Sequence, residues 1–287
     1  NKDEIHLYSD EERPFSDIHS MAQKGIREIY CCLSALDGKD LKQLLEEADR
    51  YMIRVRFFPD DLLLNERLKI KTINKVPIYI LRPEPLQTDK HKLMKRSFDV
   101  CFSLFVLVFI LSWLTPLLWL IIRLESKGPV FFRQKRTGMD NREFYCYKFR
   151  SMVYSNSTSD SEQASRNDQR VTRIGAFLRK TSIDELPQFF NVLRGDMSVV
   201  GPRPHMLLHT DQYRRKIEKY MIRHYVKPGI TGLAQINGFR GGTEELIDMQ
   251  LRLEHDIEYV ENWTFLLDMK IIFLTIWNLF HPDKNAY

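Results

Sequence analysis

Residues 100–122, VCFSLFVLVFILSWLTPLLWLII, contain no charged side chain and decide the architecture of the chain. As an α-helix this stretch would extend roughly 34 Å, which is enough to cross a hydrocarbon core about 30 Å thick. Pro116 lies inside it and cannot donate a hydrogen bond to the carbonyl of Ser112, so we expect a kink or break there. The hydroxyls of Ser112 and Thr115 would then satisfy the freed backbone groups.

Basic residues flank this apolar segment on both sides. Lys95 and Arg96 precede it, and Arg123 and Lys127 follow it. The positive-inside rule retains such flanks in the cytoplasm, and here it does not choose between the two ends. Two arrangements therefore stay open: a single transmembrane span, or a re-entrant helix that bends at Pro116 and returns to the face from which it entered.

Composition sets further bounds on the function. The 287 residues are enough for two compact units, and a net charge of only +5 gives no argument for nucleic-acid binding. The basic stretch that follows the apolar segment suits an anionic membrane surface. The chain begins with Asn1 and has no signal peptide, so we expect a piece of a longer protein. Four cysteines lack metal-ligand spacing and are expected to be reduced thiols of a cytosol-facing protein: Cys31, Cys32, Cys101 and Cys146.

Three regions are expected along the chain, at residues 1–90, 91–122 and 123–287. In the first, strand-like stretches at 27–33, 53–58 and 76–81 surround an amphipathic helix that begins at 37–40. This βαβ-like order predicts an α/β, Rossmann-like fragment with a small parallel sheet. No glycine fingerprint for a dinucleotide follows a strand, so regulation or packing is the expected role. The second region combines a linker with the membrane helix.

The third region is expected to be an α-rich α+β domain. Its polar, serine-rich stretch at 154–167 is expected to be mobile. Near the end, two apolar stretches at 263–267 and 271–277 are interrupted by charged residues. A buried core helix and a helix that lies in the membrane interface both fit this pattern, because Trp and Phe favour the interfacial depth.

Asp184 and Glu185 stand side by side in TSIDELPQ at 181–188, among several Arg and Lys residues. Two carboxylates in such surroundings suggest a site for phosphate and a divalent metal. One carboxylate would hold the metal while the other attacks phosphorus or activates an attacker. The structural alternative is that Asp184 caps a helix in which Pro187 is harmless and which ends at Gly195.

Other residues could complete such a site. Arg203 lies between two prolines in GPRP at 201–204, so a stiff loop presents a planar fork that can bind two phosphate oxygens. Lys148 and Arg150 alternate with aromatic residues at strand spacing, which indicates either a functional basic face or a merely solvated one. Gly229 and Gly232, in PGITG, predict a loop where backbone can approach a ligand.

From about residue 95 to its end, the chain resembles bacterial sugar transferases of the monotopic type, which are polyprenyl-phosphate glycosyl-1-phosphate transferases. Five stretches carry this resemblance, in the order of the family. They are KRSFDV at 95–100, FFRQKRTG at 131–138, FYCYKFRSM at 144–152, RVTRIGAFLRKTSIDELPQFFNVLRGDMSVVGPRP at 170–204 and VKPGITGLAQINGF at 226–239. The first 90 residues look like part of the soluble domain of larger members, which are similar to undecaprenyl-phosphate glucose phosphotransferases.

The resemblance implies a reaction and its location. The activity would transfer a sugar-1-phosphate from a UDP-sugar to undecaprenyl phosphate and release UMP, as the first membrane step of polysaccharide or glycoconjugate synthesis. The membrane segment would be re-entrant, and 123–287 would be a catalytic domain facing the cytoplasm at the bacterial inner membrane. The expected partners are the UDP-sugar, the polyprenyl phosphate and the membrane, without nucleic acid; a homodimer is plausible.

The resemblance also implies roles for individual residues. Asp184 would form a covalent phosphosugar intermediate, and Glu185 with Asp184 would hold Mg²⁺. A direct transfer through a ternary complex, and a non-catalytic membrane-attached scaffold or regulator, are the alternatives. The residues expected to bind substrate are Lys148, Arg150, Arg179, Gln188, Arg203, Gly229, Thr231 and Gly232, the last three at the nucleotide end.

Overall fold

The computed structural model describes residues 18–32, 36, 38–58, 69–73, 76–80, 82, 84–154, 168–239 and 246–280. Two compact units divide the chain. The first comprises Asn1–Pro83 with Arg214–Ile222, and the second comprises Glu84–Tyr213 with Arg223–Tyr287. The serine-rich stretch expected to be mobile lies, except for its first residue, outside the described residues. The chain is mixed α and β, mostly helical with small sheets.

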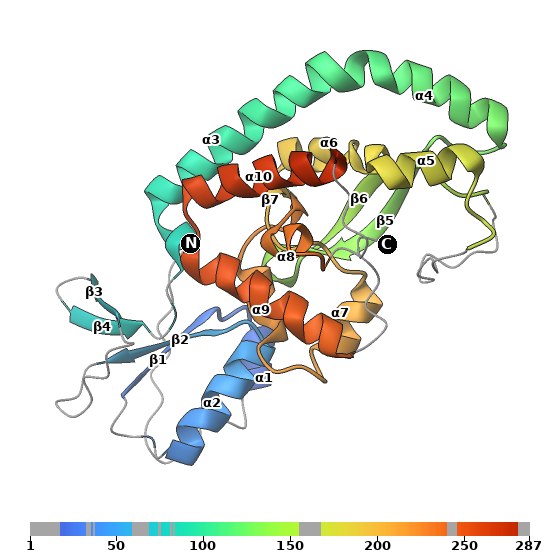
Figure 1. The fold of residues 1–287 in the computed structure, drawn as a ribbon. Coiled ribbons are helices and arrows are strands. Elements are labelled where there is room, and N and C mark those ends of the chain that lie inside the picture. Colours follow the sequence, from blue (N-terminus) through green and yellow to red (C-terminus); the bar gives the residue numbers. More distant parts are fainter. Residues whose placement is uncertain are drawn as a thin grey trace. The chain divides into compact units, whose positions relative to one another are not determined.

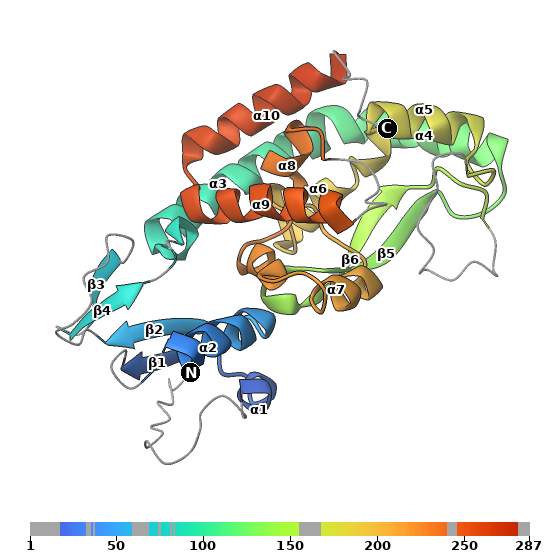
Figure 2. The ribbon, with the colours of Figure 1, turned by 60° about the horizontal axis from the view of Figure 1, so that its bottom comes forward.

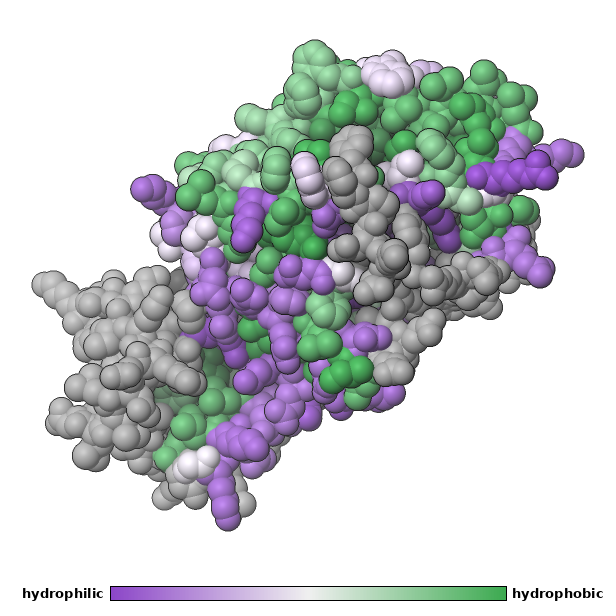
Figure 3. All heavy atoms as spheres, viewed as in Figure 1, coloured by the Kyte–Doolittle hydropathy of each residue, from purple (hydrophilic) through white to green (hydrophobic). Residues whose placement is uncertain are grey.

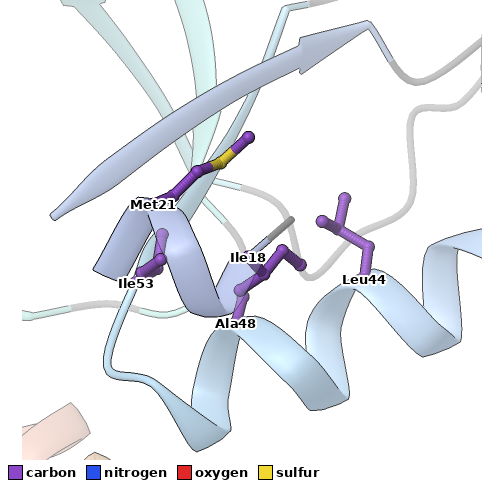
Figure 4. Close-up of a cluster of buried hydrophobic side chains, with 5 residues drawn as sticks. All are labelled: Ile18, Met21, Leu44, Ala48 and Ile53. Carbon is purple, nitrogen blue, oxygen red and sulfur yellow. The ribbon is translucent and has the colours of Figure 1, made fainter. Parts of the chain in front are cut away.

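The first unit packs two helices against a small sheet (Figure 1). Its core contains Ile18 and Met21 of α1, Leu44 and Ala48 of α2, and Ile53 just before β2, all at most 3% exposed (Figure 4). This burial explains why the leucine face of α2 has helical spacing. The elements are α1 (Ile18–Gln23), β1 (Glu28–Cys32), α2 (Gly38–Arg50), β2 (Arg54–Phe58), β3 (Lys69–Ile73) and β4 (Val76–Ile80).

The sheet of this unit corrects one expectation. The predicted strands and the helix between them are present, but the sheet order is β1-β2-β4-β3 and the sheet is mixed. β1 and β2 are parallel, whereas β4 is antiparallel to both β2 and β3. The strand β3 was missed. It reads KIKTI, and only two residues separate it from β4, a spacing typical of a hairpin rather than of a βαβ crossover. A Rossmann-like arrangement is therefore not confirmed.

The second unit surrounds two short sheets with helices (Figures 1 and 2). β5 and β6 form an antiparallel pair in which Phe132 lies opposite Lys148, and β7 and β8 form a parallel pair. The strands are β5 (Phe131–Thr137), β6 (Glu143–Phe149), β7 (Ser198–Val200) and β8 (Gly229–Thr231). The helices and short helical turns are η3 (Pro85–Gln87), α3 (Asp89–Val106), η4 (Leu107–Leu111), α4 (Ser112–Glu125), η5 (Met139–Asn141), α5 (Arg173–Thr181), η6 (Ile183–Glu185), α6 (Gln188–Arg194), α7 (Leu207–Tyr213), α8 (Leu233–Ile236), α9 (Leu246–Asn262) and α10 (Phe265–Phe280). A further turn, η7 (Tyr220–Tyr225), begins in the first unit and ends in the second.

The apolar segment is part of one helix of 37 residues, Asp89–Glu125, which is long and apolar enough to cross a membrane. Figure 1 shows it bending between α3 and α4. The irregular turn is the π-helical η4, one turn before the predicted break, and the helix continues through Pro116. Proline provides no N–H for the Ser112 carbonyl, and a wide turn beside it accommodates this loss. The Ser112 hydroxyl donates to the Val108 carbonyl, four residues earlier, and not to the Ser112 carbonyl that Pro116 leaves without an N–H. No such bond is seen for Thr115 among the described residues.

The motif KRSFDV fixes the base of this helix to the rest of the unit. Lys95 forms an ion pair with Asp268 of α10, with 2.7 Å between Nζ and Oδ2. Arg96 donates to two carbonyls in the last turn of α6. Asp99 accepts hydrogen bonds from the Ser198 hydroxyl and the Val199 backbone N–H in β7. These buried polar contacts explain why charged residues border an apolar helix.

The part of the helix beyond this base exposes its apolar side chains. Only 22% of its most apolar window is buried, so it is not a core helix. α10 also has an exposed apolar face, although Asp268 and Ile271 are fully buried on the other side. Figure 3 shows the apolar side chains gathered over α3, α4 and α10. A contiguous apolar patch of this extent favours a membrane interface over a buried position for α10. The exposed apolar side chains of α10 are Leu266, Phe273, Ile276, Trp277 and Leu279.

Candidate active site

The Asp184–Glu185 pair lies in the short turn η6, between α5 and α6. Ser182 ends α5 in the left-handed conformation with φ of 59°, which turns the chain directly into η6. Both carboxylates are buried, at 7% and 6% exposure. Asp184 makes no capping bond: α6 begins at Gln188 and has no side-chain cap. The capping alternative is therefore wrong, although α6 does end at Gly195 as expected.

Glu185 is held by two cations from separate parts of the unit. Lys148 of β6 donates to Oε1 at 2.8 Å. Arg203 contacts both carboxylate oxygens with its fork, at 2.6 Å to Oε1 and 3.1 Å to Oε2. Burial alone would raise the pKa of Glu185, but Arg203 and Lys148 hold that pKa well below its usual range. The structure thus brings three predicted site residues into direct contact and keeps Glu185 ionised.

Asp184 differs from its neighbour in both partners and pKa. Among the described residues, no hydrogen bond or ion pair is found for its carboxylate. Burial raises its pKa, and the negative charge of Glu185 acts in the same direction, while Lys148, Arg179 and Arg203 oppose this rise. Two adjacent carboxylates therefore have opposite pKa shifts, which separates their chemical roles. Glu185 orders the cations, and Asp184 is the carboxylate with free oxygen atoms.

Arg179 lies at the last turn of α5 and is oriented by one hydroxyl. Its Nε donates to Ser151 Oγ at 2.8 Å, just beyond β6. Its two terminal nitrogens have no hydrogen-bond partner among the described residues. The Arg179 charge nevertheless acts on Asp184, because it lowers the pKa of that carboxyl. An arginine that is anchored at Nε and open at the fork is suited to an anion.

The loop that carries Arg203 is held by glycine contacts. Gly201 donates to the Thr231 carbonyl, and the Gly229 N–H donates to the Pro202 carbonyl. A Cβ on Gly229 would lie 2.1 Å from the Gly201 nitrogen. A Cβ on Gly232 would lie 2.3 Å from the Gly201 oxygen. These two glycines therefore serve the close packing of β8 against the Arg203 loop rather than a visible approach to a ligand.

A buried polar cluster lies behind the same loop, and sequence reasoning did not find it. Arg223 is 2% exposed and donates to the Arg203 carbonyl at 2.7 Å. It also contacts the His205 ring and lies 2.9 Å from the Asp256 carboxylate. Burial, followed by the Arg223 charge, holds the pKa of His205 well below its usual range, so this ring stays neutral. No short motif could reveal this cluster, because its members are spread over 50 residues.

Three more predicted substrate contacts are engaged elsewhere or lie buried. Arg150 donates to the carbonyls of Lys127 and Ser126, which follow α4. It therefore holds the end of the long apolar helix rather than the Asp184–Glu185 pair, the dyad. The Thr231 hydroxyl pairs with that of Thr275 on α10 at 2.6 Å. Gln188 is 2% exposed in the first turn of α6. Lys148 and Arg150, two residues apart, thus serve different parts of the unit.

The carboxylates fit Mg²⁺ only with help from a substrate. Among the residues that the structure describes, no three His, Cys, Asp or Glu side chains gather as a metal site. Mg²⁺ is usually held by one or two carboxylates together with phosphate oxygens and waters. Asp184 has free oxygens for such a bond, whereas Glu185 would have to exchange a cation. The donor set therefore suits a metal that arrives with a phosphate ligand.

Comparison with known proteins identifies a family over the part of the chain that contains Asp184 and Glu185. The sequence model of the family described as bacterial sugar transferase matches residues 90–282. The chain is 45% identical to a UDP-glucose:undecaprenyl-phosphate glucose-1-phosphate transferase of Klebsiella pneumoniae over 277 residues, 95% of this chain and 58% of that protein. It is 44% identical to the protein of that name from Escherichia coli (strain K12) over 263 residues, 91% of this chain and 56% of that protein.

A further relative has a different named substrate. The chain is 41% identical to a UDP-N-acetylgalactosamine-undecaprenyl-phosphate N-acetylgalactosaminephosphotransferase of Aeromonas hydrophila over 216 residues, 74% of this chain and 49% of that protein. The chain spans about half the length of these curated relatives. The family match, residues 90–282, includes Asp184, Glu185, Lys148, Arg179 and Arg203.

Proposed function

Because the chain belongs to the bacterial sugar transferase family, we propose that it transfers a sugar-1-phosphate from a UDP-sugar to undecaprenyl phosphate and releases UMP. UDP-glucose is the donor to test first, since the named glucose-1-phosphate transferases align over 91–95% of the chain. The N-acetylgalactosamine relative aligns over 74%. The product, a lipid-linked sugar diphosphate, would begin a polysaccharide or glycoconjugate.

Asp184 would be the nucleophile of a two-step reaction. One Oδ atom attacks the β-phosphorus of the UDP-sugar, and the bond from that phosphorus to the bridging oxygen breaks with its electron pair on UMP. The resulting acyl phosphate carries the sugar. An oxygen of undecaprenyl phosphate then attacks the same phosphorus, and Asp184 leaves as a carboxylate. Splitting the transfer allows the soluble donor and the lipid acceptor to bind in turn.

The cations would bind the phosphates and stabilise the transition state. Arg179 presents a free fork while Ser151 holds its Nε, so it can take a phosphate without breaking a contact. Arg203 and Lys148 are ordered by Glu185 before substrate binds. Fixed charges need no reorganisation as charge develops on phosphorus oxygens, which is the usual source of catalysis in phosphoryl transfer. Mg²⁺, when held by Asp184 and Glu185, would neutralise diphosphate oxygens.

The apolar surface would place this site at the membrane. The base of the helix is tied to α6 and β7, the segments that follow the dyad and precede Arg203. We propose that the helix is re-entrant and that the site faces the cytoplasm of the inner membrane. Cysteines introduced at Lys92 and Lys127 should both react with an impermeant label from the cytoplasmic side. Labelling of either from the opposite side would show a plain transmembrane span.

A single observation carries the proposed mechanism: Asp184 is a buried carboxylate without a hydrogen-bond or ion-pair partner in the described part of the chain, and it lies next to Glu185, which orders two cations. The test is mass spectrometry after brief incubation with UDP-glucose and Mg²⁺ but without lipid acceptor. A phosphosugar adduct should appear on the peptide that contains Asp184, together with one equivalent of UMP. In Asp184→Asn the adduct should be absent and turnover should fall by several orders of magnitude.

Other outcomes separate the alternatives. If UMP appears only when undecaprenyl phosphate is also present, and no adduct forms, transfer is direct and Asp184 serves as metal ligand or base in a ternary complex. If no UMP forms with any UDP-sugar and acceptor, the chain is a membrane-attached scaffold or regulator. Glu185→Gln should instead reduce turnover in a way that added Mg²⁺ partly restores, because it removes a ligand charge and not the attacking atom.

A further inference from the structure

We propose that Asn191 is a positioning residue that sets β6, and through it Lys148, against the carboxylate pair. Asn191 lies in α6 and is fully buried, at 0% exposure. Its side chain makes two hydrogen bonds to the backbone of β6. Oδ1 accepts from the Tyr147 N–H at 3.0 Å, and Nδ2 donates to the Tyr145 carbonyl at 2.7 Å. This inference rests on the proposed function, because it names a further residue for that reaction.

The Asn191 carboxamide takes the hydrogen-bonding place of a neighbouring strand at one edge of β6. The sheet of β6 contains one other strand, β5, which covers one edge of β6. Residues 145 and 147 are two apart, so the N–H of one and the C=O of the other point to the same edge. Asn191 supplies one donor and one acceptor at that edge, as a peptide unit of a neighbouring strand would. Buried backbone groups require such partners.

The position of this contact matters for Lys148, which follows Tyr147. Lys148 reaches Glu185 at 2.8 Å, and Glu185 precedes α6 by only three residues. Asn191 therefore fastens the helix that continues from the dyad to the strand that carries its cation. A shift of β6 relative to α6 would move the backbone of Lys148 away from Glu185 and so weaken their 2.8 Å contact.

The backbone of Asn191 extends the same connection toward Arg203. Its carbonyl accepts from the N–H groups of Gly195 and Asp196, at 3.1 and 3.0 Å. This turn ends α6 and leads into β7, after which the chain enters the Arg203 loop. One residue thus joins the three segments that carry Lys148, the dyad and Arg203. Only the contacts of its side chain can be removed by substitution.

Asn191→Asp tests the side chain through a pH profile. The introduced carboxyl is isosteric. Burial, the Tyr145 carbonyl and the Asp196 carboxylate, whose Oδ2 lies 3.4 Å from Asn191 Nδ2, all act to raise its pKa. When protonated, it can donate to the Tyr145 carbonyl and accept from the Tyr147 N–H; when ionised, it loses the donor and repels that carbonyl. Turnover of Asn191→Asp relative to the unchanged protein should be at least tenfold lower at pH 8. The ratio should recover severalfold toward pH 6.

Thr210→Val is the matched control. Thr210 is also buried, at 4% exposure, and its hydroxyl pairs with that of Thr137 at 2.8 Å, so the change likewise removes a buried hydrogen bond. Turnover per folded molecule should stay within about twofold of the unchanged protein at both pH values, even if thermal stability falls. A ratio for Asn191→Asp that does not depend on pH, or turnover equal to that of the control, would overturn the proposal.

A second measurement is independent of catalysis. Acetylation of lysines, quantified by mass spectrometry, should modify Lys148 several times faster in Asn191→Ala than in the unchanged protein. Lys135, on β5 and paired with Glu143, should react at the same rate in both. If the unchanged protein releases no UMP, the proposed function fails and this comparison still decides the role of Asn191. Equal Lys148 reactivity in the folded variant would refute it.

Discussion

Replacement of Arg203 by lysine separates the charge of this residue from its fork. Arg203 makes two hydrogen bonds to Glu185, whereas a lysine ammonium can reach only one carboxylate oxygen. Its backbone should keep its place, because the Arg223 side chain donates to the Arg203 carbonyl and the Gly229 N–H donates to the Pro202 carbonyl. The variant therefore keeps the positive charge and changes its geometry.

The expected loss follows from these contacts. A hydrogen bond to a charged group contributes about 1.5–3 kcal/mol. The Arg203 side chain keeps 24% of its surface exposed, so water replaces part of the lost bond, and we expect a fall of about 1–2 kcal/mol in unfolding free energy. For turnover, loss of the fork at a phosphate should cost tenfold or more, which is about 1.4 kcal/mol of barrier.

The assay measures UMP release under saturating UDP-glucose and thermal unfolding of the same preparations. Arg194→Lys is the control, since the Arg194 side chain is 64% exposed and its contacts are long, at 3.3 Å to Tyr147 and 3.6 Å to Asp196. It should match the unchanged protein in both measurements within about 0.5 kcal/mol.

The dependence on pH checks the assignment to Glu185. The folded pKa of Glu185 is depressed, so its contribution to stability is present above the unfolded value and is lost as pH falls through the folded value. The stability difference between Arg203→Lys and the unchanged protein should therefore be complete at pH 7 and shrink only well below the ordinary pKa of glutamate. Near-normal turnover with unchanged stability would mean that Arg203 is only a surface charge.

Three further predictions concern the nucleophile, the loop and the membrane helix. Attack requires ionised Asp184, whose pKa is raised, so the acid limb of the pH profile of UMP release should lie above the ordinary value of 3.8. Lys148→Met should move this limb to higher pH, because it removes a cation that lowers the pKa of Asp184; a limb that stays in place would contradict this. Gly229→Ala should destabilise the second unit by about 2–3 kcal/mol in chemical unfolding, because its Cβ would clash with the Gly201 nitrogen; a neutral effect would show that the loop yields. Pro116→Ala restores an N–H for regular helical bonding, so it should straighten the helix and lower turnover while thermal unfolding of the first unit is unchanged; unchanged turnover would exclude a role for the bend.

Local patterns in the sequence were sufficient for several elements. The leucine spacing of 38–50 predicted α2, and the uncharged run at 100–122 predicted the long apolar helix. Gly195 ended α6 as expected, because a residue in the left-handed conformation is needed there. Motifs also brought Lys148, Arg203 and the dyad into one hypothesis, and the structure places Lys148 and Arg203 in contact with Glu185. Their roles in catalysis stay predictions.

Tertiary structure alone decided how these elements meet. Whether β4 runs parallel or antiparallel to β2 depends on the strand β3 between them in sequence, and not on any pattern within β4. Arg150 and Lys148 are both basic and lie two residues apart, as expected for one basic face of a strand. Arg150 nevertheless binds the end of α4, and Lys148 binds Glu185. Sequence spacing fixes the direction of a side chain only within its own element, whereas its partner depends on what packs against that element.

The same reasoning explains the two carboxylates. Asp184 and Glu185 are chemically alike and adjacent, so the sequence could not separate their pKa values. Their difference arises because Lys148 and the Arg203 fork converge on Glu185 from distant segments. Asp184 is buried, and no residue that the structure describes bonds to its carboxylate. The sequence by itself determined that an acidic pair lies among cations, in a chain that also carries a long apolar helix. Only packing decided which carboxylate holds those cations, because electrostatic energies depend on distances of a few ångströms between groups far apart in the chain.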